Sequence, residues 1–384
     1  MEDLFVPEAI PYKDGAVIKV IGVGGAGGNA VDNMIKAGVS NVEFIAMNTD
    51  YKALSKNKAQ NKILLSKNGL GAGCRPEVGK ASALEYIDAI RSSLNGADMV
   101  FITCGLGGGT GTGAAPVIAA AAKSAGILTV AVVYMPRTAE GIKKKQLAEA
   151  GLEELKEHVD SYIVVPNDGM QDAGHKKNFF ETLRIADDVL RQSVQGIAEM
   201  ATGSGHMNID FADVCTAMGE RGKSVMGIGR ASGENRAKQA FEDALKSPLL
   251  ADTSIMGSFF VLANITCNID DFSNDEFEEI SALIQEHAGQ GAEIKVGVTC
   301  DDRVDETLSV TVVATGISGA KKVSPTPSDD PITHINVKLK HSASGEEITS
   351  KVRNISRGDR NLRAIGDVSD DMFEIPTYLR KQAD

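Results

Sequence analysis

Residues 107–113, a run of five glycines and two threonines, constrain the fold of this chain more than any other stretch. The run follows the apolar residues 99–104 and precedes the apolar, alanine-rich residues 114–119. A glycine-rich turn between a strand and a helix presents backbone N–H groups at the positive end of the helix dipole, where phosphate binds. A tight turn that only permits close packing is the alternative, but it needs one or two glycines. The run therefore predicts a phosphate-binding loop.

We expect two further glycine-rich stretches, residues 22–28 and 69–73, at the same edge of the sheet as the run 107–113. Gly22, Gly24 and Gly27 satisfy the dinucleotide fingerprint G-x-G-x-x-G, and Asp50 follows about twenty residues later. This pattern also fits a Rossmann dehydrogenase with Asp50 on the ribose of NAD. A dinucleotide needs only one pyrophosphate loop, however, whereas several loops that converge on one pocket favour a mononucleotide with a longer phosphate chain.

A P-loop of the GxxxxGK[ST] type is excluded by one position. Gly222, Lys223 and Ser224 resemble its end, but Ala217 stands where its first glycine belongs. We therefore expect residues 222–224 to form a surface loop.

The hydrophobic pattern predicts an α/β fold with a Rossmann-like, doubly wound parallel sheet. Apolar runs that read as buried strands alternate with helical patterns, and ligands bind beyond the carboxyl ends of such strands. A helix of over twenty residues with one apolar stripe follows, and it has the length to pack on two domains. The expected strands are residues 16–21, 42–47, 99–104, 127–133 and 161–165, with three more at 259–265, 293–299 and 308–314 in a smaller α+β domain.

These patterns divide the chain into six parts. We expect a flexible N-terminal arm, a nucleotide-binding domain, a central helix, a C-terminal domain that begins with an acidic loop, a disordered linker and a terminal docking peptide. The docking peptide opens with acidic residues and closes with basic ones, and a disordered tail with chance aromatic residues is its alternative. The respective residues are 1–15, 16–178, 179–204, 205–320, 321–368 and 369–384.

Composition and charge narrow the function. The formal net charge of −12 argues against a nucleic-acid binder, which usually has a basic surface. The five cysteines lack metal-ligand spacing, so we expect free thiols in a reducing cytoplasm. No signal-like start and no apolar run of membrane-spanning length occur, which predicts a cytosolic protein without direct membrane insertion.

Polar side chains near expected strand ends and helix starts leave two interpretations open. Asp210 and Asp213 stand near the start of an expected helix, close to Asn208. Acidic residues there commonly cap a helix, but two carboxylates and an amide can also hold and polarise a water molecule. Glu140 and Asn167 are likewise turn or capping residues, or ligand contacts.

Together these features resemble the tubulin/FtsZ family of polymerising GTPases. The glycine run 107–113, the opening glycine loop, the loop 208–213 and the tail peptide occur in the order typical of that family. The resemblance implies binding of GTP/GDP with Mg²⁺, and head-to-tail assembly of the protein with itself into protofilaments of the division ring at mid-cell. It implies that membrane-anchor and regulatory division proteins bind the tail peptide. A non-hydrolysing nucleotide-binding scaffold that copolymerises is the alternative.

The resemblance also assigns roles to single residues. Asn208, Asp210 and Asp213 match the loop that enters the pocket of the next subunit and polarises the attacking water. Glu140 would bind the ribose. Asp187 and Asn167 would bind the guanine base. No metal ligand is assigned.

Some positions depart from the common family pattern. Lys144 stands where an arginine usually reaches the phosphates, and Leu183 stands where an aromatic side chain stacks on the base. Lys52 and Arg75 replace the usual Gln and Asn. The positions expected to contact the nucleotide are Gly24, Gly25, Ala26, Gly27, Gly28, Asn29, Gly71, Ala72, Gly73, Gly107, Gly108, Gly109, Thr110, Gly111, Thr112, Gly113, Glu140, Lys144, Asn167, Leu183 and Asp187.

Overall fold

The computed structural model describes residues 15–165, 179–202, 207–219, 222–250, 254–300 and 306–317, all within the compact unit Met1–Lys321. The expected N-terminal arm up to residue 14, Asn167, the linker and the tail peptide lie outside the described residues, as does the side chain of Leu183. Among the described residues, no helix combines the length and the apolar character needed to cross a membrane.

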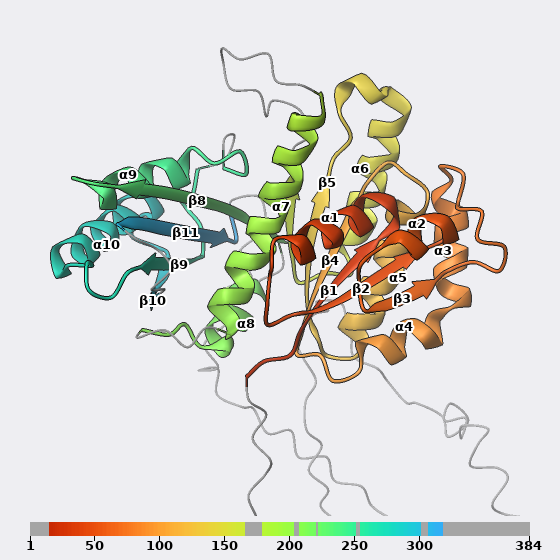
Figure 1. The fold of residues 1–384 in the computed structure, drawn as a ribbon, viewed down its shortest axis with the longest axis horizontal. Coiled ribbons are helices and arrows are strands. Elements are labelled where there is room, and N and C mark those ends of the chain that lie inside the picture. Colours follow the sequence, from red (N-terminus) through yellow and green to blue (C-terminus); the bar gives the residue numbers. More distant parts are fainter. Residues whose placement is uncertain are drawn as a thin grey trace, which may run out of the picture. The chain divides into compact units, whose positions relative to one another are not determined.

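A seven-stranded, wholly parallel sheet forms the first part of the fold, in the order β3-β2-β1-β4-β5-β6-β7 (Figure 1). The expected doubly wound sheet is confirmed. Its central strands are buried along most of their length because helices cover both faces. The strands are β1 Ile18–Val23, β2 Glu43–Asn48, β3 Asn61–Leu64, β4 Met99–Gly105, β5 Leu128–Tyr134, β6 Ser161–Val165 and β7 Gly222–Lys223.

Alternate residues of each strand face opposite helical layers, as the pleat of a strand requires. Val20, Phe101 and Val132 pack with α1 (Gly24–Lys36), α2 (Tyr51–Lys56), α7 (Phe179–Thr202) and α8 (Phe211–Met218). Their sequence neighbours pack toward the other face, where four helices lie. These are α3 Pro76–Glu85, α4 Ile87–Leu94, α5 Thr110–Ser124 and α6 Ile142–Lys156, the last preceded by the short 3₁₀ turn η1 Thr138–Glu140.

The long helix α7 packs against both sheets, as its apolar stripe predicts. The second sheet has four strands in the order β10-β9-β11-β8, and α7 runs between the two sheets in Figure 1. At the contact, a Cβ placed on Gly196 would lie 2.6 Å from the Cε atom of Met226. The elements of this part are β8 Val225–Ser232, α9 Arg236–Leu245, β9 Phe260–Cys267, α10 Asn274–Ala288, β10 Glu293–Cys300 and β11 Thr307–Thr315.

The prediction of a surface loop at residues 222–224 is wrong. Gly222 and Lys223 form β7, which pairs with β6, and Ser224 is buried with its hydroxyl hydrogen-bonded to that of Ser161. The pattern missed this strand because it is two residues long and is held by backbone pairing rather than by apolar side chains.

The strand β8 was also not predicted, because two glycines interrupt its apolar pattern. These glycines allow α9 to pack directly on the strand: a Cβ on Gly229 would lie 1.9 Å from the carbonyl oxygen of Ala240. The second sheet consequently has four strands rather than three.

Candidate nucleotide site

The glycine loops meet where the sheet changes direction. The neighbouring strands β1 and β4 continue into α1 and α5, which cover opposite faces, so a crevice opens at the carboxyl ends of the two strands. The loops are in close contact there: a Cβ on Gly24 would lie 3.1 Å from the amide nitrogen of Gly111, and one on Gly105 would lie 2.7 Å from the Cβ of Ala26. The absence of a side chain at Gly24 and Gly105 permits this approach.

The third glycine loop reaches the same place. Leu70 forms a backbone bridge with Asp50, at the carboxyl end of β2. A Cβ on Gly109 would lie 2.8 Å from the Cβ of Ala72. The hydroxyls of Thr49 and Thr110 share a hydrogen bond of 2.6 Å. The predicted convergence of several loops on one pocket therefore holds for the three loops at residues 22–28, 69–73 and 107–113.

Two helix N-termini border this crevice. The helix α1 begins at Gly24 and α5 begins at Thr110, and neither N-cap residue makes a capping hydrogen bond through its side chain among the described residues. Their first N–H groups therefore remain for a ligand, and the two dipoles favour an anion. This arrangement suits a polyphosphate.

Within the run 107–113, packing and binding are divided among different residues. The backbone N–H of Gly107 donates to the hydroxyl of Thr112 at 2.8 Å, and Thr112 is 3% exposed. A Cβ on Gly113 would lie 1.9 Å from the carbonyl oxygen of Pro76, so this glycine seats α5 on α3. Gly108 and Thr110 are partly exposed, and a Cβ on Gly108 would meet open space. Gly108 and Thr110 are therefore the residues of the run that remain accessible to a ligand.

Asp187 lies where α7 passes α1 and β5. Its Oδ1 accepts a hydrogen bond from the hydroxyl of Tyr134 at 2.9 Å, and its Oδ2 accepts one from Nδ2 of Asn33 at 2.8 Å. Burial raises the pKa of Asp187 above its ordinary value, although these two hydrogen bonds and the charge of Lys36 act in the opposite direction. The sequence did not reveal Asn33 or Tyr134. The one signal for Asn33 is its place a single helical turn after Asn29.

Glu140 and Lys144 are paired with each other. The ammonium of Lys144 donates to Oε2 of Glu140, and the backbone N–H of Arg137 donates to its Oε1 at 2.9 Å. Partial burial opposes ionisation of Glu140, but these hydrogen bonds outweigh it and lower its pKa. The pair links η1 to the first turn of α6, and it lies close to the crevice, because a Cβ on Gly107 would lie 2.6 Å from the carbonyl oxygen of Lys144.

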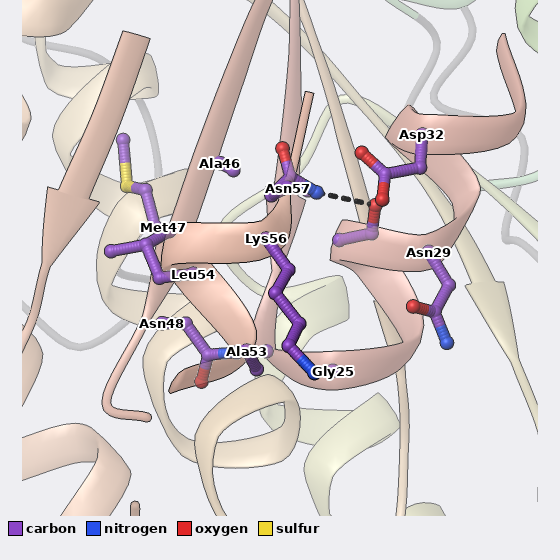
Figure 2. Close-up of a pocket in the computed structure, with 13 residues that line it drawn as sticks. Gly25, Asn29, Asp32, Ala46, Met47, Asn48, Ala53, Leu54, Lys56 and Asn57 are labelled. Carbon is purple, nitrogen blue, oxygen red and sulfur yellow. Dashed lines mark hydrogen bonds between the residues drawn. The ribbon is translucent and has the colours of Figure 1, made fainter. Parts of the chain in front are cut away.

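A cavity of about 290 Å³ adjoins the first glycine loop, on the β2 side of α1 (Figure 2). Gly24, Gly25 and Asn29 line it, and the side chain of Lys56 extends toward Gly25. A Rossmann dehydrogenase would bind its ribose through an acidic residue here. The carboxylate of Asp50 instead accepts a hydrogen bond from the backbone N–H of Ala53 at 3.1 Å and caps α2.

The acidic loop lies at the other end of α7, beside α8 (Figure 1). Met207 pairs with Val298 of β10 through two backbone hydrogen bonds, and Asp210 is the N-cap residue of α8 without a side-chain capping bond. An oxygen of Asp213 lies 3.3 Å from the ammonium of Lys295. Asn208 and Asp210 are exposed.

The acidic loop and the glycine loops are far apart within one chain. The roughly 15 residues of α7 from Asp187 to its end at Thr202 span about 22 Å at about 1.5 Å per residue. The described structure therefore brings Asn208, Asp210 and Asp213 together on one loop, but not into the crevice of their own subunit.

Comparison with known proteins identifies both parts of the fold. Residues 17–175 match the family described as Tubulin/FtsZ family, GTPase domain, and residues 222–318 match the FtsZ family, C-terminal domain. The chain is 43% identical to the cell division protein FtsZ of Wigglesworthia glossinidia brevipalpis, over 98% of this chain and 100% of that protein. It is 44% identical to the cell division protein FtsZ of Pseudomonas aeruginosa, over 96% of this chain and 97% of that protein.

A solved structure has the same fold. The chain resembles an empty FtsZ dimer of M. jannaschii with a TM-score of 0.74 and 40% sequence identity, over 79% of this chain and 89% of that one.

Proposed function

This chain belongs to the FtsZ family of tubulin-like GTPases, and from that premise we propose which of its residues bind GTP and which hydrolyse it. It is a GTPase that polymerises in cell division. The non-hydrolysing scaffold that the sequence left open is not favoured by these relatives.

One observation carries the proposal: the glycine loops and the acidic loop lie at opposite ends of α7. Since the acidic loop cannot reach the crevice of its own subunit, we assign it to the crevice of the next one. A contact between two different faces that does not close on itself produces a filament. In such a filament each interface holds one nucleotide between the loops of one subunit and the acidic loop of its neighbour.

In the crevice, the N-termini of α1 and α5 bind the phosphates through backbone N–H groups, together with the hydroxyl of Thr110. Among the described residues, no group of three or more acidic, His or Cys side chains could hold a metal. Mg²⁺ suits this site, because it takes most of its oxygens from phosphates and water, and when bound it neutralises phosphate charge.

At the base end, the carboxylate of Asp187 accepts hydrogen bonds from N1–H and the 2-amino group of guanine, neither of which adenine offers as a donor. Glu140 binds the ribose, and Lys144 lies beside it within reach of the phosphate loop.

Hydrolysis requires the acidic loop of the neighbouring subunit. The carboxylates of Asp210 and Asp213 and the amide of Asn208 orient a water molecule for in-line attack on the γ-phosphorus, and a carboxylate accepts its proton. The side chain of Leu70, 82% exposed, stands on the glycine-loop face and that of Met207, 47% exposed, on the acidic-loop face. Exposed apolar side chains at both ends support a contact between these two faces.

We further propose that the protein works in the cytoplasm at the division ring and that residues 369–384 bind membrane-anchor proteins. The body of the chain does not enter the membrane itself. Removal of residues 369–384 should abolish recruitment to anchor-bearing vesicles while leaving GTP turnover in solution unchanged.

The experiment that tests the function is GTP turnover per subunit as a function of protein concentration. A site shared by two subunits predicts negligible turnover at low concentration and a cooperative onset as filaments form. Turnover per subunit that is independent of concentration would contradict the shared site. Absence of turnover at every concentration would restore the scaffold hypothesis.

A further inference from the structure

The carboxylate of Asp187 is supported by donors from two other elements. Tyr134, at the end of β5, donates to one oxygen, and Asn33, in α1, donates to the other. Each carboxylate oxygen has two acceptor positions, so each keeps one for a ligand. The two donors thus fix the plane of the carboxylate and leave a pair of acceptors.

These donors also oppose the effect of burial. Asp187 is partly buried, and its pKa is raised by that burial, while the hydrogen bonds from Tyr134 and Asn33 and the charge of Lys36 lower it. Burial and the neighbouring carboxylate raise the pKa of Tyr134, so its hydroxyl stays protonated and remains a donor. Loss of either donor would favour the neutral carboxyl group, which presents only one good acceptor to the two donors of guanine.

We propose that Tyr134 and Asn33 are positioning residues that hold Asp187 for two-point recognition of guanine. The inference rests on the proposed role of Asp187. It predicts that selectivity for guanine depends on Tyr134 and Asn33 although neither side chain contacts the base. Both act by holding the carboxylate of Asp187. If the tyrosine hydroxyl were merely a satisfied core group, its removal would weaken all nucleotides equally.

The test is equilibrium binding of GTP and of inosine triphosphate to monomers, below the concentration at which filaments form. Inosine triphosphate has N1–H but lacks the 2-amino group, so it reports one of the two contacts. We expect Tyr134→Phe and Asn33→Leu each to weaken GTP binding roughly tenfold and inosine triphosphate binding less, so that the ratio of the two affinities falls.

A matched control is Tyr162→Phe, which removes a hydroxyl from the adjacent strand β6, where the ring lies beside Lys156 rather than Asp187. It should leave both affinities unchanged. As the pH is lowered, Tyr134→Phe should also lose GTP binding at a higher pH than the parent protein does. Without the tyrosine hydrogen bond, the carboxyl group of Asp187 is protonated at a higher pH.

Two outcomes separate this inference from the proposed function. If Asp187→Ala loses GTP while Tyr134→Phe and Asn33→Leu keep the parent ratio of affinities, the positioning role is overturned and the guanine contact stands. If Asp187→Ala binds GTP as the parent does, the guanine contact itself is overturned. Asn33 is only partly buried in α1, so its variant keeps the test valid even if Tyr134→Phe does not fold.

Discussion

At the scale of single residues, Gly24 shows why the nucleotide loops need glycine. Its φ is +73°, and a Cβ there would lie 3.1 Å from the amide nitrogen of Gly111. A side chain would therefore strain the backbone and separate the two loops at once. Not every glycine of the chain carries such a constraint: Gly291 has no positive φ, and a Cβ there would meet open space.

The variant Gly24→Val should lose GTP binding. Backbone strain and the displaced amide of Gly111 together should weaken the affinity about 10- to 100-fold. Equilibrium binding to monomers measures this, with Gly291→Val as the matched control that keeps the parent affinity. Equal affinities in the two variants would show that the contact between the loops does not form the phosphate site.

A second prediction at this scale concerns base selectivity. Xanthine differs from guanine at C2, where it has a carbonyl acceptor in place of the amino donor. An amide can accept from N1–H and donate to that carbonyl. The variant Asp187→Asn should therefore lose affinity for GTP and gain affinity for xanthosine triphosphate, by about tenfold in each direction. Competition binding with the two nucleotides measures the exchange, and an unchanged preference for GTP would refute it.

At the scale of elements, β10 holds the acidic loop in place. Met207 pairs with its Val298, Ile209 packs on its Gly297, and Asp213 lies beside its Lys295. A Cβ on Gly297 would lie 2.9 Å from Cγ1 of Ile209. On the role that we propose for the acidic loop, the second sheet contributes to hydrolysis without contacting the nucleotide bound by its own subunit.

The variant Gly297→Val should displace Ile209 and, with it, the acidic loop. We expect GTP turnover to fall at least about tenfold while monomers bind GTP as before, because the glycine loops are untouched. Parallel measurement of turnover and of monomer affinity distinguishes this effect from unfolding. Undiminished turnover would mean that β10 does not position the loop.

The helices α9 and α10 are joined by a partly buried ion pair. The guanidinium of Arg236, on the first turn of α9, donates from Nε to Oε1 of Glu276 at 2.6 Å. This bond lowers the pKa of Glu276 below its ordinary value of 4.5, against the effect of burial. Because the folded-state pKa is depressed, the stabilisation is present above pH 4.5 and is lost as the pH falls through the folded-state value.

Substitution of Glu276 should reveal how much the ion pair stabilises the fold. Glu276→Gln should reduce the free energy of unfolding by about 2 kcal/mol at neutral pH, and the difference from the parent should shrink as the pH falls below 4.5. Urea unfolding at several pH values measures it. A difference that is constant with pH would show that the ionised pair does not stabilise this part of the fold.

At the scale of the molecule, the parts predicted from the sequence are those encoded by local pattern. Apolar runs located the central strands, and glycine runs located the three loops that the structure brings together. The strands β3, β7 and β8 are absent from the prediction. The edge strand β3 is short and half exposed, and backbone pairing and helix packing, rather than side-chain hydrophobicity, hold β7 and β8 in the sheets. Asn33 and Tyr134 were missed because their contacts with Asp187 join three elements, which no spacing along the chain encodes.

The long helix α7 connects the glycine-loop part of the fold to the acidic loop. It carries Asp187 near the crevice and ends at the acidic loop, so it fixes the distance between the two halves of the site. A rigid separation of about 22 Å means that the two halves can meet only in successive subunits. On the mechanism we propose, assembly and hydrolysis are coupled by geometry alone, since the acidic loop reaches a nucleotide only when a neighbour arrives.

Mixing two inactive variants tests this shared site most directly. Gly24→Val keeps the acidic loop but binds GTP so weakly that it stays largely empty at a GTP concentration that saturates the parent protein. Asp213→Ala binds GTP but lacks the carboxylate that orients the water, which should lower turnover about 100-fold or more. In a mixture, the intact acidic loop of the first variant meets GTP held by the second. The account predicts that a mixture that co-sediments in filaments hydrolyses GTP although neither variant does so alone. A co-sedimenting mixture as inactive as its two components would contradict it.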